Sequence, residues 1–306
     1  MHWNTMPATH ARSIVTLVIT MVIWGSTFVV TKAVNEQVAP FTLALVRVTI
    51  GALVLLGCAL VRQVRGGEHA PWSALPWGTM AMMALIGVML YYAVFNYSLE
   101  YTSASQGALV QSCIPAMTAL VAVVWLREHA SVLRWTGIAL SMAGVLIVFS
   151  GGAAQSDGGS LLGNVLMFLS AVFWGVYTSM AKRVATFDPL QVTAGILGAG
   201  AVMLLPLAAF EIAAEGMPQI GLQGWLGLIY LGAGASGLAY MLYNAALQHV
   251  DASEAGVYTN LIPIVGVITG VMLGEPLSGR AIVGGVVVLV GVWLTSRQPA
   301  VSQAEA

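Results

Sequence analysis

The chain has 306 residues, of which 58% are hydrophobic and only 8% are charged. Soluble globular domains carry about 25% charged residues, so this composition excludes an ordinary soluble domain and predicts that lipid is the solvent for much of the chain. The net charge of −1 argues against a nucleic-acid partner.

The apolar residues form ten stretches, each close to the ~20 residues that a helix needs to cross a bilayer. In chain order they are 13–34, 41–62, 76–99, 104–126, 132–150, 160–181, 189–213, 222–247, 252–273 and 278–296. The first stretch follows a short basic region, but it is too long for a signal peptide and lacks a small-x-small cleavage site. We therefore expect it to remain as the first span.

The second half of the chain repeats the first about 150 residues later, and the Gly/Ser-rich segment 151–160 links the two copies. Matched positions include Trp24 and Trp174, Tyr92 and Tyr240, Asn96 and Asn244, Pro115 and Pro263, and Glu128 and Glu275. We predict an all-α integral membrane protein with ten transmembrane helices in two five-helix repeats, residues 1–150 and 151–306. Because each repeat has an odd number of spans, the second enters from the opposite side and the repeats are inverted.

Basic residues predict the orientation, because they collect on the cytoplasmic side of a membrane protein. With the N-terminus inside, the cytoplasmic ends and loops hold Arg12, Arg62, Arg65, Arg127, Arg134, Lys182, Arg183 and Arg297. The outer side holds only Lys32 and Arg280. We expect a multi-pass protein of the inner (cytoplasmic) membrane with both termini in the cytoplasm.

The chain has ten predicted spans in two halves. Each half has a Trp-Gly pair in its first span, a proline in its fourth span and a glutamate at the end of that fourth span. This pattern resembles the EamA type of the drug/metabolite transporter superfamily. Within it, the chain is similar to bacterial YddG-like amino-acid exporters. The resemblance implies a central cavity and export of amino acids or related metabolites. The expected partners are a small-molecule substrate and the lipid bilayer, with the protein as a monomer or homodimer. No zinc motif, phosphate loop or nucleotide fingerprint occurs, so we expect no cofactor.

Trp24 lies about twelve residues into the first span, which at ~1.5 Å per residue places it near the middle of the bilayer. Interfacial tryptophans lie at the ends of spans instead. Trp24 and its repeat partner Trp174 could therefore offer an aromatic wall to a substrate ring or ammonium group. For Trp24, packing over the small Gly25 and Ser26 is the alternative.

Two polar pairs are spaced four residues apart, Tyr92 with Asn96 and Tyr240 with Asn244, so each pair lies on one helix face. Such groups are costly in lipid, and we expect them to face the protein interior or a wet cavity. They would hydrogen-bond a polar substrate. The alternative is bonding between helices, at about 0.6 kcal/mol per bond.

Pro115 and Pro263 lie near the middle of the fourth and ninth spans, where proline removes a backbone donor and leaves a carbonyl without its partner. Transporters place substrate sites and hinges at such interruptions, so we predict a cavity-lining or hinge role, with a simple bend as the alternative. Polar neighbours expected to line the same cavity are Gln111, Ser112, Tyr258 and Asn260.

Arg47 is the only basic residue well inside a span. One interpretation is a counter-charge for a substrate carboxylate. The other is a snorkelling arginine paired with Glu36 or Glu100. The repeat partner of Arg47 is Ile196, so this charge is not duplicated.

Glu128 and Glu275 end the fourth and ninth spans on opposite membrane faces. They would clamp a loop or gate by pairing with nearby arginines, or they are solvated helix ends. No acidic residue lies within the first span or near mid-depth in any other, whereas ion-coupled carriers commonly need an intramembrane carboxylate. We therefore expect a facilitator.

The segment Gly234-Ala235-Ser236-Gly237 resembles the nucleophile motif of rhomboid-type intramembrane proteases, which need a histidine near the serine. His249 lies about 20 Å along the same helix, so we favour a packing face and predict no enzyme. The sequence predicts a transporter that exports amino acids, aromatic and other neutral ones among them, by alternating access. Another small metabolite or drug is the alternative, and an intramembrane enzyme is a remote one.

Overall fold

The computed structural model describes residues 8–65, 71–125, 131–152, 160–250, 258–275 and 277–296, and every regular element in these ranges is a helix. Eight helical segments are long and apolar enough to cross a membrane: Arg12–Asn35, Pro40–Val64, Trp77–Tyr101, Ala104–Trp125, Val132–Ser150, Leu161–Ala181, Pro189–Glu215 and Leu222–Ala246. Two shorter apolar helices, Leu261–Met272 and Gly279–Thr295, occupy the predicted ninth and tenth spans. The expectation of an all-helical membrane protein is confirmed.

The first half starts with two uninterrupted helices, α1 (Ala8–Asn35) and α2 (Pro40–Val64). After the short η2 (Trp72–Ala74), the predicted third span consists of α3 (Trp77–Ala84), η3 (Leu85–Leu90) and α4 (Tyr91–Tyr101). The fourth consists of α5 (Ala104–Gln111) and α6 (Ile114–Trp125), and the fifth is α7 (Val132–Gly152). Pro40 opens α2 because its fixed φ suits the first helical position and its missing N–H has no helical partner there.

The second half follows the same order. It contains α8 (Leu161–Ala181), η4 (Lys182–Val184), α9 (Pro189–Glu215), α10 (Leu222–Ile229), η5 (Tyr230–Leu238), α11 (Ala239–Ala246), α13 (Leu261–Met272) and α14 (Gly279–Ser296). Asp188 begins α9 as its N-cap, because its carboxylate accepts a hydrogen bond from the Leu190 N–H at 2.8 Å.

A π-helical segment interrupts the third predicted span, and another interrupts the eighth. η3 ends two residues before Tyr92, and η5 ends two residues before Tyr240. π-helices are rare and often accompany functional sites, because the wider turn rotates the side chains that follow. Glycine permits close packing in η3, since a Cβ on Gly87 would lie 2.1 Å from the ring of Tyr177.

The two predicted hinge prolines lie just after breaks in helices. α5 ends before Ser112 and Cys113, and Pro115 is the second residue of α6. Asn260 precedes α13, and Pro263 is the third residue of that helix. A proline in the first turn forfeits no helical hydrogen bond, so these positions start new helices rather than kink continuous ones.

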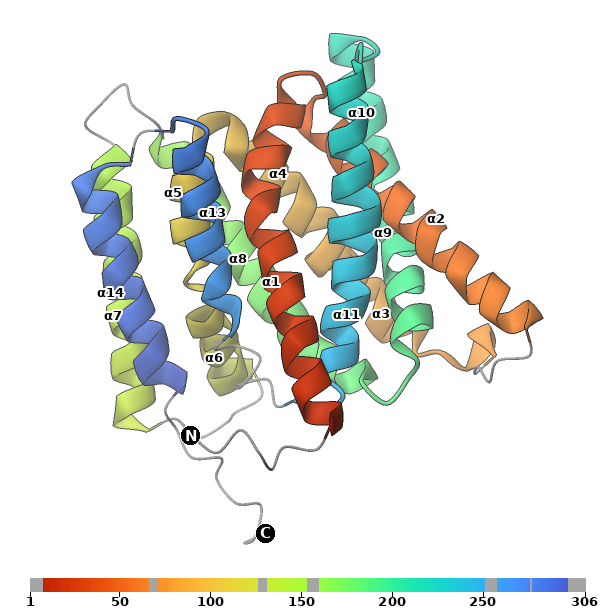
Figure 1. The fold of residues 1–306 in the computed structure, drawn as a ribbon, viewed down its shortest axis with the longest axis horizontal. Coiled ribbons are helices and arrows are strands. Elements are labelled where there is room, and N and C mark those ends of the chain that lie inside the picture. Colours follow the sequence, from red (N-terminus) through yellow and green to blue (C-terminus); the bar gives the residue numbers. More distant parts are fainter. Residues whose placement is uncertain are drawn as a thin grey trace, which may run out of the picture.

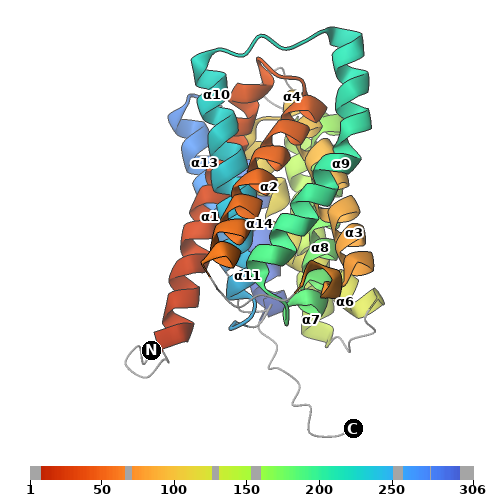
Figure 2. The same ribbon diagram turned by 90° about the vertical axis from the view of Figure 1, so that its right-hand side faces the viewer.

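Helices from the two halves pack against each other in matched pairs. α1 contacts α11 and α13, whereas α8 contacts α4 and α6; α2 contacts η5, whereas α9 contacts η3. α7 lies beside α14 at one edge of the molecule (Figure 1). α2 and α9 cross at the opposite edge (Figure 2).

Glycines allow the close approach of α7 and α14. A Cβ on Gly144 would lie 2.6 Å from the backbone nitrogen of Val288 and 2.7 Å from the carbonyl oxygen of Gly284. Because both obstacles are backbone atoms, no side-chain rotation could make room for it. Small residues of this kind let transmembrane helices pack backbone to backbone.

Apolar side chains cover the outside of the molecule and polar ones are buried inside it. Leu53 of α2 is 64% exposed and Phe210 of α9 is 75% exposed, whereas Asn96 and Ser236 have no exposed surface. This distribution suits a protein surrounded by lipid. We call the end of the bundle where α1 and α4 end and α2 and α5 begin the upper end, and the end where α11 ends and α9 begins the lower end (Figure 1).

Candidate functional site

A cavity of about 30 Å³ lies at the centre of the bundle, among α1, α2, α4, α5, α6, α8, α11 and α13. Seven of its twelve lining residues are aromatic: Trp24, Phe28, Tyr91, Tyr92, Phe95, Trp174 and Tyr240. The polar lining residues are Thr27, Arg47 and Gln111. Because ~10–15 Å³ is enough for one water molecule, the cavity has room for about two waters.

The two repeated tryptophans meet at this cavity. The ring centroids of Trp24 and Trp174 lie 5.1 Å apart in an edge-to-face arrangement. Tyr240 packs edge-on against both rings, with centroids 5.6 Å from Trp24 and 5.1 Å from Trp174. The indole N–H of Trp24 donates to the carbonyl of Ala235 at 3.1 Å, which fixes the ring relative to η5. The edge-to-face arrangement of these three rings is a preferred geometry of aromatic pairs.

The two repeated tyrosines also line the cavity, and each bonds to a π-helical segment of the opposite half. The Tyr240 hydroxyl donates to the carbonyl of Gly87 in η3 at 3.0 Å. The Tyr92 hydroxyl accepts from the hydroxyl of Ser236 in η5 at 3.1 Å. The sequence therefore identified four residues, Trp24, Trp174, Tyr92 and Tyr240, that the fold brings together.

Arg47 lies in the cavity wall with 2% of its surface exposed. Its Nε donates to the Ser236 hydroxyl at 3.1 Å and its Nη1 to the Thr31 hydroxyl at 3.3 Å. The guanidinium carbon lies 4.4 Å from the centroid of the Tyr92 ring, which is a cation–π distance. Within the described part of the chain no carboxylate forms an ion pair with Arg47, so the pairing with Glu36 or Glu100 is not present.

Gln111 also reaches the cavity. Its Nε2 donates to the Ser170 hydroxyl at 2.7 Å and contacts the Met167 sulfur at 3.4 Å, whereas its Oε1 has no partner among the described residues. The neighbouring Ser112 is buried, donates to the Leu109 carbonyl and does not line the cavity.

The other predicted polar residues near the helix breaks lie away from this cavity. Tyr258 is partly buried against the core, and the Oδ1 of Asn260 is buried without a partner in the described structure. Neither residue belongs to the cavity lining. Pro115 and Pro263 also lie outside it, one residue beyond the lining residues Ile114 and Ile262.

Asn96 and Asn244 lie outside the cavity, towards its two ends. The Nδ2 of Asn96 donates to the carbonyl of Pro40 at the start of α2, at 3.2 Å. The Nδ2 of Asn244 donates to the hydroxyl of Thr193 in α9, at 2.9 Å. Each amide thus joins the third or eighth predicted span to the helix that begins beside it, which is the interhelical alternative that the spacing left open.

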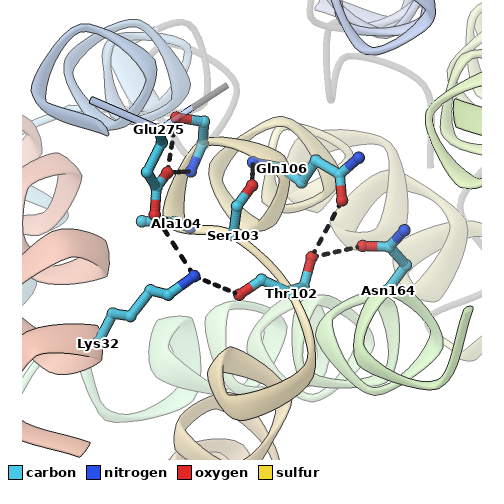
Figure 3. Close-up of polar contacts among 8 residues, drawn as sticks. Lys32, Thr102, Ser103, Ala104, Gln106, Asn164 and Glu275 are labelled. Carbon is cyan, nitrogen blue, oxygen red and sulfur yellow. Dashed lines mark hydrogen bonds and ion pairs between the residues drawn. The ribbon is translucent and has the colours of Figure 1, made fainter. Parts of the chain in front are cut away.

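A polar network links the helices at the upper end of the bundle (Figure 3). Glu275 accepts from the N–H of Ala104 at 2.9 Å, and from the N–H and hydroxyl of Ser105 at 2.8 and 2.9 Å. The Nζ of Lys32 lies 3.5 Å from the same carboxylate and donates to the carbonyl of Thr102 at 3.1 Å. The carboxylate therefore caps the start of α5 while Lys32 holds it to α1.

The surroundings of Glu275 keep it ionised. Burial alone would raise the pKa of the Glu275 carboxyl. The hydrogen bonds from Ser105 and Ala104 and the charge of Lys32 outweigh burial and hold that pKa below its ordinary value. Beside this group, the Thr102 hydroxyl lies 2.8 Å from the Oδ1 of Asn164, which extends the closure to α8 (Figure 3). The other predicted gate residue, Glu128, lies outside the described residues.

The structure contains a second buried carboxylate clamp that sequence reasoning missed. Glu211 of α9 is 7% exposed and accepts from the N–H of Phe41 at 3.1 Å and from the N–H and hydroxyl of Thr42 at 2.6 and 2.7 Å. It caps α2 as Glu275 caps α5. At the lower end Arg62 of α2 pairs with Asp188, the N-cap of α9. The sequence feature that could have indicated this clamp is a glutamate near the end of one apolar helix together with a Pro-x-Thr sequence at the start of another helix across the bundle.

Comparison with known proteins gives the family. The model of the EamA-like transporter family matches residues 11–150 and again residues 161–297. The chain belongs to the EamA-like transporter family. As a member of this family, the chain is a multi-pass membrane transporter and not an enzyme. The serine of the protease-like motif, Ser236, serves instead as a buried hydrogen-bond partner of Arg47 and Tyr92.

Relatives of this EamA-like transporter cover nearly its whole length. An uncharacterized transporter of Archaeoglobus fulgidus is 28% identical over 92% of this chain and 96% of its own. The uncharacterized transporter YyaM of Bacillus subtilis is 26% identical over 89% of each chain. A solved crystal structure superposes with a TM-score of 0.65 at 22% identity, covering 94% of this chain and 98% of the other, and so has the same fold.

Proposed function

We propose that this EamA-like transporter exports amino acids, with aromatic and other neutral ones as substrates, by alternating access. The observation that carries the proposal is the central cavity, walled by aromatic rings and supplied with one cation and one amide. Aromatic rings suit an apolar side chain or an ammonium group, and a few fixed polar groups orient a ligand in such a site. Zwitterionic amino acids combine these features.

The proposed architecture is ten spans in two inverted repeats, residues 1–150 and 151–306. Two separate matches to one family model and the matched helix contacts support it. Five spans in each repeat would place the second copy upside down and both termini on the same side, and the basic residues would place that side in the cytoplasm. The central cavity then lies between equivalent helices, where a rocking motion exposes it to either side in turn.

We propose that contacts between helices at the ends of the bundle act as gates to the cavity. The cavity has room for about two waters, so a substrate requires movement of its walls. Separating Glu275 from Ala104 and Ser105 would open the upper end, since these bonds join α13 to α5. The helix breaks before Pro115 and Pro263 give the moving helices places to bend.

We propose a facilitator because no carboxylate is among the described residues that line the central cavity. Coupling to protons or sodium commonly relies on an intramembrane carboxylate that binds the ion. The carboxylates of Glu211 and Glu275 cap helices at the upper end instead, and their oxygen atoms are occupied by N–H and hydroxyl donors.

Reconstitution of the purified protein into liposomes tests the function. A panel of labelled aromatic, aliphatic and charged amino acids is applied without any ion gradient, beside protein-free liposomes. We expect aromatic and other neutral amino acids to enter faster than into empty liposomes. If none of the panel does, the amino-acid proposal fails. Accumulation against a gradient driven by protons or sodium would contradict the facilitator.

A further inference from the structure

The cavity contains a buried cation with unused hydrogen-bond donors. A guanidinium carries five N–H groups. Those of Arg47 have two protein partners in the described structure, both neutral hydroxyls, on Ser236 and Thr31. Removing an ionised group from water costs far more than two neutral hydrogen bonds return. The remaining N–H groups therefore constitute a site with a strong preference for an anion.

The same cavity contains a buried acceptor that has no donor among the described residues. The Ser170 hydroxyl donates to the Met167 carbonyl at 2.7 Å, so it accepts from Gln111 and fixes the amide nitrogen on that side. In the described part of the chain the Gln111 oxygen has no partner, and only 3% of the residue is exposed. An unpartnered acceptor in a low-dielectric site favours a cationic donor such as an ammonium group.

We propose that Arg47 and Gln111 recognise the two ends of a zwitterionic α-amino acid head group, with the carboxylate on Arg47 and the ammonium on the Gln111 oxygen. This inference rests on the proposed function and names its substrate class. The aromatic wall contacts the substrate's side chain. The cavity disfavours amines that lack a carboxylate, because the described residues that line it carry one positive charge and no negative one.

Arg47 also joins helices, and the test must separate this structural role from ligand binding. Its contacts connect α2 to Thr31 of α1, Tyr92 of α4 and Ser236 of η5. A purely structural arginine would affect every ligand equally when replaced. Loss of a carboxylate subsite would weaken only the binding of ligands that carry a carboxylate.

Three probes that share one ring distinguish these roles: L-phenylalanine, 3-phenylpropanoate and 2-phenylethylamine. Binding is measured on purified protein by ligand-induced thermal stabilisation, for wild type, Arg47→Gln and Gln111→Met. We expect wild type to bind phenylalanine at least about tenfold more tightly than phenylethylamine, because only phenylalanine has a carboxylate that can accept charged hydrogen bonds from Arg47. Arg47→Gln should weaken phenylalanine and phenylpropanoate about tenfold or more and should not weaken phenylethylamine, whose ammonium group then no longer faces a positive charge.

Gln111→Met gives the complementary result. It should weaken phenylalanine several-fold and leave phenylpropanoate unchanged, because only the former carries an ammonium group. Arg280→Gln is the matched control, since Arg280 is exposed and donates to the Ser150 carbonyl away from the cavity. It should bind all three probes as wild type does.

The outcomes separate this inference from the proposed function. If wild type transports no amino acid but binds phenylpropanoate through Arg47, the function fails and the carboxylate subsite stands. If Arg47→Gln binds phenylalanine and phenylpropanoate as wild type does, or if wild type binds none of the probes, the inference is overturned. Should Arg47→Gln not fold, Arg47→Lys replaces it. That variant keeps the charge and loses the planar fork, so unchanged binding of both carboxylates would equally overturn the inference.

Discussion

At the scale of single residues, Trp24 shows how a sequence position becomes part of a site. Its depth in the first span excludes an interfacial role, and the fold places its ring against Trp174 and Tyr240. Its indole N–H reaches Ala235 in the opposite half. The residue therefore joins the two halves at the cavity that we propose as the substrate site.

Replacing Trp24 tests that role. Trp24→Ala should reduce amino-acid uptake about tenfold or more, because it removes an aromatic wall whose pairs contribute ~0.5–1.5 kcal/mol each beyond simple burial. Trp24→Phe keeps a ring, loses the bond to Ala235 and should retain part of the activity. Both variants should insert into the membrane at wild-type levels, checked by membrane fractionation. Full uptake by Trp24→Ala would make the ring a packing residue only.

Replacing Glu275 tests the upper closure. Glu275→Gln removes the charge that caps α5 and attracts Lys32, so the upper end should open more often. A reporter cysteine at Thr27 in the cavity wall, with Cys58 and Cys113 changed to serine, measures this through labelling by a membrane-impermeant thiol reagent from outside. We expect labelling several-fold faster with Glu275→Gln than without it. Equal rates would show that Glu275 does not control access.

The same carboxylate sets a pH dependence. Because its pKa is held below the ordinary glutamate value of about 4.3, the closure contributes stability above that pH and loses it as pH falls through the lowered pKa. Thermal stability of wild type should therefore exceed that of Glu275→Gln by a constant margin between pH 6 and pH 8. The margin should shrink only below about pH 4. A margin that disappears between pH 6 and pH 8 would contradict this assignment.

Part of the site was predictable from residue type, depth and repetition, which identified the paired tryptophans and tyrosines. Asn96 and Asn244 were predicted to line the cavity beside the tyrosines, because a spacing of four residues places two side chains on the same helix face. It does not fix depth, and one turn moves a side chain by about 5.4 Å, out of the cavity and against a neighbouring helix. Ser236 and Thr31 as partners of Arg47 depend on contacts between distant segments, which no local pattern contains.

At the scale of elements, periodicity and length predicted the helical segments well, because a bilayer requires long apolar helices. The π-helical segments η3 and η5 were not predictable, since nearly all their residues are apolar or small and a rotation of the helix face leaves no trace in such a sequence. Pro115 and Pro263 did mark discontinuities. The structure refines them from kinks within helices to the first turns of new helices.

The packing of α7 against α14 gives a prediction at this scale. Gly144→Ala would place a Cβ 2.6 Å from the backbone of Val288, so the helices must separate. We expect a loss of about 1–3 kcal/mol of stability, measured by thermal or denaturant unfolding in detergent. Gly198→Ala in α9 is the control, because a Cβ there meets nothing within 4 Å. It should be neutral or stabilising by up to about 1 kcal/mol, and an equal loss in both variants would refute the packing argument.

At the scale of the whole molecule, the proposed ten spans and the distribution of basic residues predict how the chain is oriented in the membrane. An even number of spans with the basic loops inside places both termini in the cytoplasm. A C-terminal green fluorescent protein fusion should fluoresce, and a C-terminal alkaline phosphatase fusion should be inactive. An active phosphatase would place the C-terminus outside and contradict the ten-span arrangement.

Counterflow in proteoliposomes tests the central claim most directly, because it distinguishes a carrier that alternates access from a channel or a non-transporting protein. Vesicles are loaded with unlabelled L-phenylalanine and diluted into a trace of the labelled amino acid, with no ion gradient present. We predict a transient accumulation of label above the external concentration that is present with wild type and lost with Trp24→Ala. Label that never exceeds equilibration with wild type, for phenylalanine and the other neutral amino acids alike, would contradict the account.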